Sequence, residues 1–175
     1  MFAIPNYPIL IIYATQTGTT KQIAKDLHSN LQNQGFQAIL KQINGLKPSD
    51  LTGVSAFIFA TSTYGAGEFP QMAIRPLAEF KTPAFAQHFK GLKYGIFGVG
   101  STEFASFCSA ADAAERLFEG LGCRKIIEIG RLDRARKLGD QQAGGVLGWC
   151  DEFARFVQPV DGMTICREIE TIFEE

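Results

Sequence analysis

Long hydrophobic runs are missing from the sequence: no apolar stretch approaches the ~20 residues that a helix needs to cross a bilayer. The apolar run near the start, residues 9–13, follows no basic residue and precedes no small-residue cleavage site, so we expect no signal peptide. An excess of one charge is also missing, because 17 Lys and Arg residues stand against 18 Asp and Glu residues. Dedicated nucleic-acid-binding domains carry a basic excess. The sequence therefore indicates neither a membrane nor a nucleic acid as partner.

Cysteine and histidine are scarce, and their spacing does not match the usual metal motifs. No two of the four cysteines form a C-x-x-C pair, and neither His28 nor His88 lies near a cysteine in sequence. The cysteines are Cys108, Cys123, Cys150 and Cys166. This pattern predicts reduced thiols in a cytoplasmic protein, with no disulfide framework and no metal site.

The length of 175 residues suits one domain, and an apolar fraction of 46% is enough for a core without disulfides or metal. No internal repeat, low-complexity tract or linker interrupts the chain. We therefore predict a single domain over residues 1–175, with a core at about 9–157. Residues 158–175 follow as an appendix, predicted to be helical because its apolar residues recur at helical spacing.

Short apolar runs alternate with helical patterns along the core. Buried strands are predicted over residues 9–13, 37–43, 54–60, 94–99 and 126–129. Amphipathic helices are predicted over residues 21–33, 72–80, 110–121 and 146–157. This alternation predicts an α/β fold, a doubly wound parallel sheet of five strands with helices on both faces. In such sheets ligands bind at the carboxyl ends of the strands, so the loops there are the candidate site.

The loop after the first strand is rich in threonine. It consists of Thr15, Gln16, Thr17, Gly18, Thr19 and Thr20. Hydroxyl groups and free backbone N–H groups at a helix N-terminus favour a phosphate. The loop is neither a Walker A motif nor G-x-G-x-x-G, and it contains no cation. The alternative is a threonine-rich helix cap with no ligand.

Two further loops carry aromatic residues. The loop after the 54–60 strand places Tyr64 between hydroxyl residues and glycines, and the loop after the 94–99 strand carries Phe104 and Phe107. An aromatic side chain at a strand end can stack on a flat ring, and glycine lets backbone approach that ring closely. Alternatively, Tyr64 packs on the next helix, and one of the two phenylalanines belongs to the core. Together the three loops fit a ligand with a phosphate tail and a flat ring, namely flavin mononucleotide (FMN).

Three segments together resemble the flavodoxins, most closely the flavodoxin-like domains of diflavin reductases and the stand-alone MioC-type flavodoxins. Residues 15–20 match the phosphate-loop pattern S/T-x-T-G-x-T/A. Residues 63–70 match T-Y-G-x-G-D/E-x-P, and residues 100–108 match G-N/D/S-x-x-Y/F-x-x-F-C/N. The resemblance runs from about residue 9 to residue 157 and implies a five-stranded parallel sheet of order 2-1-3-4-5.

By matching position, the resemblance implies that residues 15–20 hold the FMN phosphate, with Tyr64 stacked on one face of the ring and Phe104 on the other. Gly65 then lies beside flavin N5, where its carbonyl accepts a hydrogen bond from the N5–H of the singly reduced ring. The residues implied to line the ring are Ser62, Thr63, Tyr64, Gly65, Gly67, Val99, Gly100, Ser101, Thr102, Glu103, Phe104, Phe107 and Cys108. No catalytic residue is implied, since the flavin carries the chemistry.

The sequence departs from the family in two places. The outer stacking residue is usually tyrosine and is here Phe104. The family often has an acidic run after the last strand, whereas residues 131–137 carry four cations and one aspartate. Cations near the ring favour the fully reduced, anionic flavin, so we expect a less negative potential for the second one-electron reduction than in acidic flavodoxins. Alternatively, this stretch is a solvated basic loop that points away from the ring.

The resemblance implies a monomeric electron-transfer protein that carries single electrons between a separate flavoprotein NAD(P)H reductase and an acceptor protein. The basic stretch suggests a partner with an acidic patch. Two other functions stay open at this point, because a fold alone does not decide function. One is a flavin-dependent reductase of quinones or other small molecules. The other is an interaction module that keeps the fold but no longer binds flavin.

Overall fold

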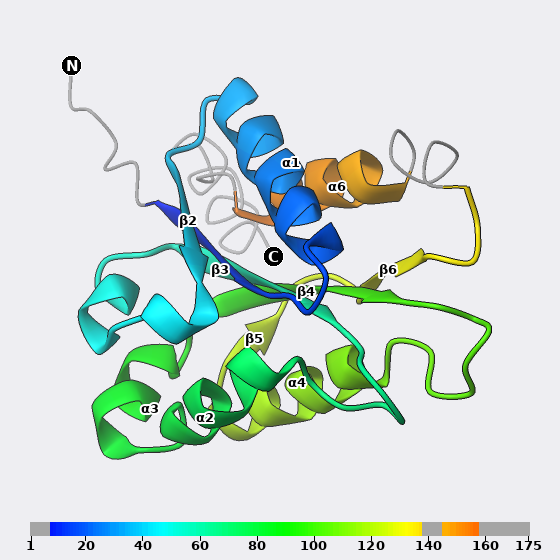
Figure 1. Ribbon diagram of the computed structural model, residues 1–175. Coiled ribbons are helices and arrows are strands. Elements are labelled where there is room, and N and C mark those ends of the chain that lie inside the picture. The colour runs from blue at the N-terminus through cyan, green and yellow to red at the C-terminus, as the bar shows by residue number, and fades with distance from the viewer. Residues whose placement is uncertain (1–7, 138–144, 158–175) are drawn as a thin grey trace, which may run out of the picture.

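The computed structural model describes residues 8–137 and 145–157. Its centre is a parallel sheet with the strand order β2-β1-β3-β4-β5 and helices on both faces (Figure 1). The strands are β1 (Ile9–Ala14), β2 (Ala38–Gln42), β3 (Ala56–Ser62), β4 (Lys93–Gly100), β5 (Arg124–Lys125) and β6 (Gly130–Asp133). The helices are α1 (Thr19–Asn33), α2 (Gln71–Glu79), α3 (Pro83–Phe89), α4 (Ser109–Gly120) and α6 (Leu147–Val157), with 3-10 turns at Ile43–Gly45 and Pro48–Leu51. The predicted fold and strand order are confirmed.

Both faces of the sheet are buried, which is why its central strands have continuous apolar runs. Ile9 and Ile11 of β1 pack into one core cluster with α1 and α6. Leu10 and Ile12 of the same strand pack into a second cluster with α2, α3 and α4. Figure 1 shows α1 and α6 on one side of the sheet and the other three helices on the opposite side. A strand buried on both faces leaves only its end exposed, so ligand contacts must come from the loops.

The second core cluster is largely aromatic, and it explains a helix that the sequence analysis missed. The ring of Phe118 lies 4.9 Å from Phe57 and 5.7 Å from Phe89, measured between centroids. Phe89 and Phe85 belong to α3, a helix of seven residues. Its two buried aromatic residues are too few to show a helical period, and the tertiary contacts of these rings stabilise it.

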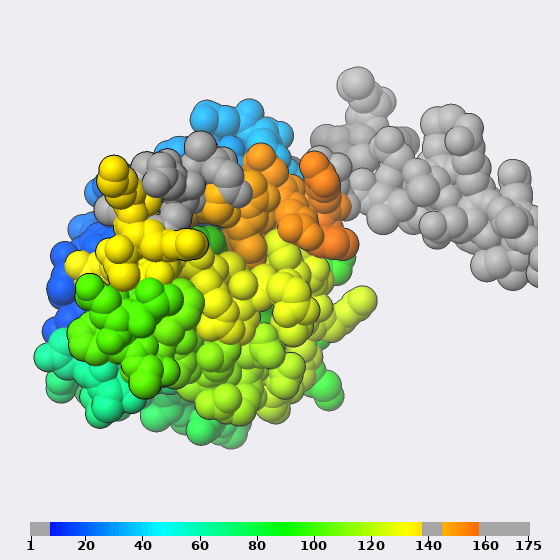
Figure 2. Space-filling view, turned by 90° about the vertical axis from the view of Figure 1, so that its right-hand side faces the viewer, coloured from blue at the N-terminus to red at the C-terminus, as the bar shows by residue number. Residues whose placement is uncertain are grey.

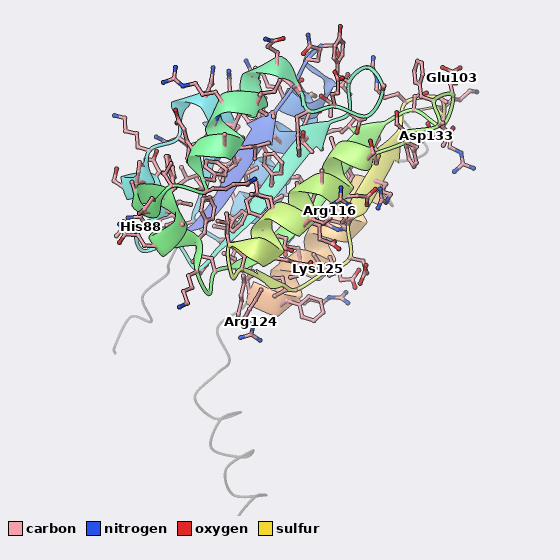
Figure 3. The ribbon with its side chains drawn as sticks, turned by 90° about the horizontal axis from the view of Figure 1, so that it is seen from below. His88, Glu103, Arg116, Arg124, Lys125 and Asp133 are labelled. Atoms are coloured by element: carbon pink, nitrogen blue, oxygen red, sulfur yellow. The ribbon has the colours of Figure 1, made fainter. Side chains whose placement is uncertain are left out.

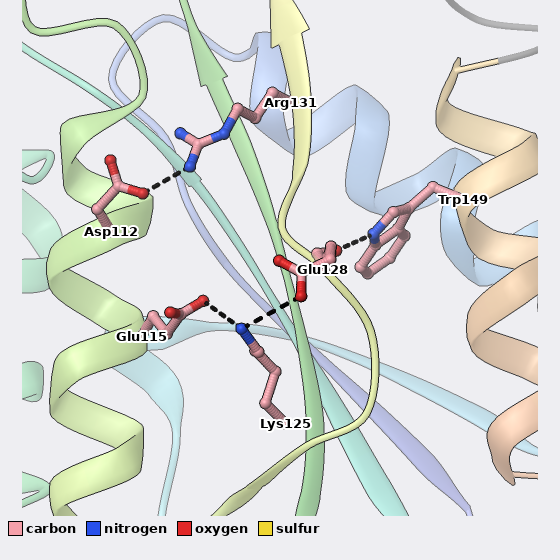
Figure 4. A network of polar contacts seen from close by, with 6 residues as sticks. All are labelled: Asp112, Glu115, Lys125, Glu128, Arg131 and Trp149. Carbon is pink, nitrogen blue, oxygen red and sulfur yellow. Dashed lines mark hydrogen bonds and ion pairs between the residues drawn. The ribbon is translucent and has the colours of Figure 1, made fainter.

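The prediction of a strand over residues 126–129 is wrong. These residues lie between β5 and β6, two short strands that each pair with β4. Trp149 of α6 donates its indole N–H to the carbonyl of Glu128 at 2.9 Å (Figure 4). The Glu128 side chain forms an ion pair with Lys125 at 3.6 Å. The fifth position of the sheet is therefore occupied by two strands with a break between them.

Three further points concern the C-terminal residues, membrane-spanning helices and metal ligands. The helical appendix predicted for residues 158–175 lies outside the described residues. In the described part of the chain, no helix is long and apolar enough to cross a membrane. The same part contains no group of three or more His, Cys, Asp or Glu residues placed to hold a metal ion.

Candidate functional site

The pairing register brings the carboxyl ends of four strands to one edge of the sheet. Ser62 at the end of β3 pairs with Val99 of β4, and Gly100 at the end of β4 pairs with Asp133 at the end of β6. The end of β1 lies beside β3 on the other side. The three loops predicted to bind a ligand, and the segment after β6, therefore leave the sheet side by side.

The loop between β1 and α1 has the features of an anion site. Gly18, the residue before α1, has a φ of 96° and donates its N–H to Thr15 Oγ1 at 2.9 Å. A left-handed φ of this kind favours glycine. The first N–H groups of a helix have no partner within it, and the first turn of α1 carries no acidic residue. The dipole of this 15-residue helix adds partial positive charge at the same place, which favours a phosphate.

Two buried hydroxyls at this edge have no hydrogen-bond partner among the described residues. They are Thr20 Oγ1 in the first turn of α1 and Ser62 Oγ at the end of β3. Buried polar groups are ordinarily hydrogen bonded. Elsewhere in the described chain, the only unpaired buried side-chain oxygen or nitrogen is the Tyr94 hydroxyl in the aromatic core. Unpaired hydroxyls at two predicted cofactor positions fit a polar group bound at this edge.

The loop after β3 is a tight turn that leaves its aromatic side chain exposed. Tyr64 and Glu68 exchange two backbone hydrogen bonds of 2.8 Å. Gly65 and Gly67 have φ values of 55° and 115°, a left-handed region that favours glycine at both positions. The Tyr64 side chain is 52% exposed. It is therefore not buried against the next helix, which was the alternative left open by the sequence.

The loop after β4 places its two phenylalanines differently. Phe107 packs against the second core cluster, whereas Phe104 is 63% exposed. One of the two aromatic residues thus belongs to the core, as one interpretation of the sequence expected, and the other faces solvent. The described chain exposes only four large hydrophobic side chains, and Tyr64 and Phe104 are two of them. Both expected ring contacts are therefore accessible to a ligand.

Hydrogen bonds fasten the loop after β3 to the first turn of α4, the helix that directly follows the loop after β4. Ser109, where α4 begins, donates its hydroxyl to the Gly67 carbonyl at 3.0 Å. The N–H of Ala110 donates to Thr63 Oγ1 at 3.3 Å. Side chains that bind a ligand are more effective when their loops are held in place before binding. The loop that carries Tyr64 is therefore held against α4, at the point where the loop that carries Phe104 ends.

Two of the predicted ring-lining residues have no accessible side chain. Val99 is 1% exposed and Cys108 is fully buried, so neither side chain is available to a ligand. Cys108 has a φ of 54°, the only positive value at a non-glycine residue in the described chain. Burial raises the pKa of its thiol to about 11, although the nearby Arg131 opposes this shift. A thiol with that pKa is a poor nucleophile, which supports a structural role for Cys108.

The end of β6 and the segment after it are part of this edge, and the sequence analysis assigned no contact to Asp133. Both carboxylate oxygens of Asp133 accept hydrogen bonds from Thr102 in the loop after β4. These hydrogen bonds hold the pKa of Asp133 below its usual range. Figure 3 shows Asp133 near Glu103 at the same end of the sheet. The only signal in the sequence was the unusual basic stretch in which this aspartate lies.

The arginines of this stretch have different partners. Arg131 forms an ion pair with Asp112 of α4 at 2.6 Å (Figure 4). Arg134 instead donates from Nη1 to Thr17 Oγ1, in the threonine-rich loop, at 3.4 Å. Figure 2 shows this segment, in yellow, between the green loop after β4 and the blue start of the chain. Arg134 therefore reaches the loop that is predicted to bind the phosphate.

The comparison with known proteins decides the family. The family model described as Flavodoxin matches residues 11–144. The chain belongs to the flavodoxin family. This flavodoxin-family chain is 36% identical over 125 residues to the sulfite reductase (NADPH) flavoprotein alpha-component of Vibrio cholerae, a match that covers 71% of this chain. It covers 20% of the relative, so the chain spans about a fifth of the length of that curated protein.

Solved flavodoxins have the same fold. The flavodoxin of Streptococcus pneumoniae TIGR4 matches with a TM-score of 0.69 at 26% identity, over 85% of this chain and 98% of that one. A flavodoxin of Fusobacterium nucleatum bound to flavin mononucleotide matches with a TM-score of 0.71 at 20% identity, over 86% of this chain and 99% of that one. The resemblance inferred from the three sequence motifs is confirmed.

Proposed function

We propose that this flavodoxin-family chain binds FMN at the carboxyl edge of its sheet and carries single electrons from a separate NAD(P)H-dependent flavoprotein reductase to an acceptor protein. One observation carries the proposal: Tyr64 and Phe104 are exposed on two loops at the same sheet edge as a candidate anion site. Exposed aromatic faces suit a flat ring, and a helix N-terminus suits a phosphate. FMN is a cofactor that has both groups.

The residues at the edge fit the two ends of FMN. Residues 15–20 bind the phosphate through hydroxyl and backbone N–H groups, which this loop supplies in number. Tyr64 and Phe104 bind the ring by stacking. When bound, FMN supplies the redox chemistry, and the chain supplies binding, orientation and electrostatics. No acid, base or nucleophile from the chain is needed, in keeping with the buried thiol of Cys108.

The proposed donor follows from the family. The Vibrio cholerae relative is named as an NADPH-linked flavoprotein component, which supports an NAD(P)H-dependent flavoprotein as the source of electrons. Electron transfer needs the donor close to the ring, so the partner docks on the edge that carries Phe104. Arg136 is exposed on the same edge, and a positive side chain there favours an acidic docking surface on the partner.

The test is a stepwise reduction of the protein loaded with FMN. The purified chain is incubated with FMN, freed of excess cofactor and reduced anaerobically while its visible spectrum is recorded. We expect the bands of oxidised flavin to remain with the protein, and the first electron to give a spectrum unlike those of the oxidised and fully reduced forms. A colourless protein would contradict FMN binding. Rapid oxidation of NAD(P)H without a second protein would contradict the carrier role and indicate a small-molecule reductase.

A further inference from the structure

The backbone of Arg134 is fixed at the edge of the sheet. Its N–H donates to the Gly100 carbonyl at 2.7 Å, which extends the pairing of β4 and β6 by one residue. The preceding residue, Asp133, is itself fastened to Thr102. The Cα of Arg134 therefore has a defined position, and its side chain crosses from β6 to the threonine-rich loop, where Nη1 lies 3.4 Å from Thr17 Oγ1.

The guanidinium of Arg134 has no carboxylate at ion-pair distance in the described part of the chain. Arg131 differs, because Asp112 neutralises it at 2.6 Å. The neighbouring Asp133 is occupied, since its carboxylate accepts hydrogen bonds from Thr102 and from the N–H of Ala135. A single 3.4 Å contact with a neutral hydroxyl uses little of the hydrogen-bonding capacity of a guanidinium, which has five N–H donors.

The threonine-rich loop lacks a cation of its own. Lys21 follows it but is exposed on α1. A phosphate bound there would meet only neutral donors from residues 15–20, unless a charge comes from another element. Arginine matches phosphate with paired, charge-assisted hydrogen bonds. We propose that Arg134 binds the phosphate group of FMN from across the sheet and makes the protein select FMN over riboflavin, which has no phosphate. This inference rests on the FMN binding proposed above, but not on the proposed partners.

The experiment measures the dissociation constants of FMN and riboflavin for the flavin-free chain, by quenching of flavin fluorescence. In Arg134→Gln we expect about tenfold weaker FMN binding, the usual loss when one charge-assisted contact is removed, and less than a twofold change for riboflavin. Arg134→Lys keeps the charge but not the planar fork, and we expect an intermediate loss. The matched control is Arg136→Gln, an exposed arginine of the same segment, which should change neither constant by more than twofold.

A variant-free measurement accompanies the series. FMN binding to the unaltered chain should weaken as NaCl is raised, because salt screens a partly exposed ion pair, whereas riboflavin binding should not. The proposal is overturned if FMN affinity in Arg134→Gln stays within twofold of the original, if riboflavin affinity falls equally, or if salt affects both flavins alike. Failure of the unaltered chain to bind either flavin would instead refute the proposed function.

Discussion

The carboxylate of Asp133 accepts two hydrogen bonds from Thr102, one from the backbone N–H at 3.0 Å and one from the hydroxyl at 2.6 Å. Thr102 lies in the loop that carries Phe104, and Asp133 immediately precedes Arg134. One buried carboxylate thus joins the proposed ring contact to the proposed phosphate contact. The geometry of the whole edge depends on its ionised form, because a neutral carboxyl accepts these two hydrogen bonds less strongly.

This dependence predicts an effect of pH on stability. Because the Thr102 hydrogen bonds lower the pKa of Asp133, the ionised group stabilises the folded chain at pH values above its ordinary pKa of about 4. That contribution is lost as the pH falls through the lower pKa of the folded state. In Asp133→Asn we expect lower stability near neutral pH and a smaller decrease as the pH falls below about 4. Urea unfolding across this range measures both, with Glu152→Gln, an exposed carboxylate on α6, as the control. Identical profiles for the original chain and Asp133→Asn would contradict the prediction.

The two exposed aromatic residues should contribute to cofactor affinity and not to folding. We expect Tyr64→Ala and Phe104→Ala each to weaken FMN binding about tenfold, since stacking on an aromatic side chain is worth roughly 1–3 kcal/mol. Their melting temperatures without FMN should stay near that of the original chain, because both side chains are more than half exposed. The control is Phe156→Ala, an aromatic residue on α6 with a similar exposed fraction of 50%. Equal loss of FMN affinity in the control would show that stacking is not the cause.

Replacing Gly67, in the loop after β3, should lower stability for steric reasons. A Cβ on Gly67 would lie 2.5 Å from Ser109 Oγ and 3.1 Å from Ser106 Cβ, in addition to the strain of a φ of 115°. Gly53 provides the matched control, since it has a φ of 76° but nothing within 4 Å of an added Cβ. We expect Gly67→Ala to lower the free energy of unfolding by about 1–3 kcal/mol more than Gly53→Ala, the usual cost of overpacking. Urea unfolding of the FMN-free proteins gives the comparison, and equal losses would mean that Ser109 moves away at little cost.

The sheet could be predicted from the sequence because its central strands are buried on both faces. In β1 and β3 this burial produces uninterrupted apolar runs, which can be recognised locally. The broken fifth position depends instead on a contact between distant residues, the Trp149 indole and the Glu128 carbonyl. The sequence of residues 126–129 alone cannot show that one of its carbonyl groups accepts a hydrogen bond from a side chain of α6.

In the candidate site too, the features encoded in continuous sequence motifs could be predicted, whereas those that depend on long-range contacts could not. The three predicted loops are short continuous motifs, each at the end of a strand, and the alternatives left open for Tyr64 and the phenylalanines needed only their burial to be known. The contact of Asp133 with Thr102 was missed because it depends on register. Only the pairing of Gly100 with Asp133 brings Thr102 next to a residue 31 positions away.

The basic segment should raise the potential of the second one-electron reduction. The fully reduced flavin is anionic, and positive side chains near it favour that form. An exposed charge pair is worth about 0.2–1 kcal/mol, which corresponds to roughly 10–40 mV for one electron. We therefore expect Arg136→Glu to make this potential more negative by tens of millivolts. A spectroscopic redox titration measures it, and a potential as low as that of acidic flavodoxins in the original chain would contradict the prediction.

Arg136 should also raise the rate at which the electron donor associates with the chain. If the donor docks an acidic surface on this edge, Arg136→Glu should slow reduction of the FMN-loaded chain by a flavoprotein NADPH reductase severalfold at low salt, because electrostatic steering mainly raises association rates. The difference should shrink above about 0.1 M salt, where charges more than roughly 10 Å apart are screened. Stopped-flow measurements at two salt concentrations test this.

Arg136 is used because Arg134 also contacts Thr17, so a change there would mix docking with cofactor binding. Arg155→Glu, with the same charge change in the last turn of α6, is the control. Equal slowing in both variants would show that net charge alone sets the rate, and no slowing in Arg136→Glu would place the docking surface elsewhere.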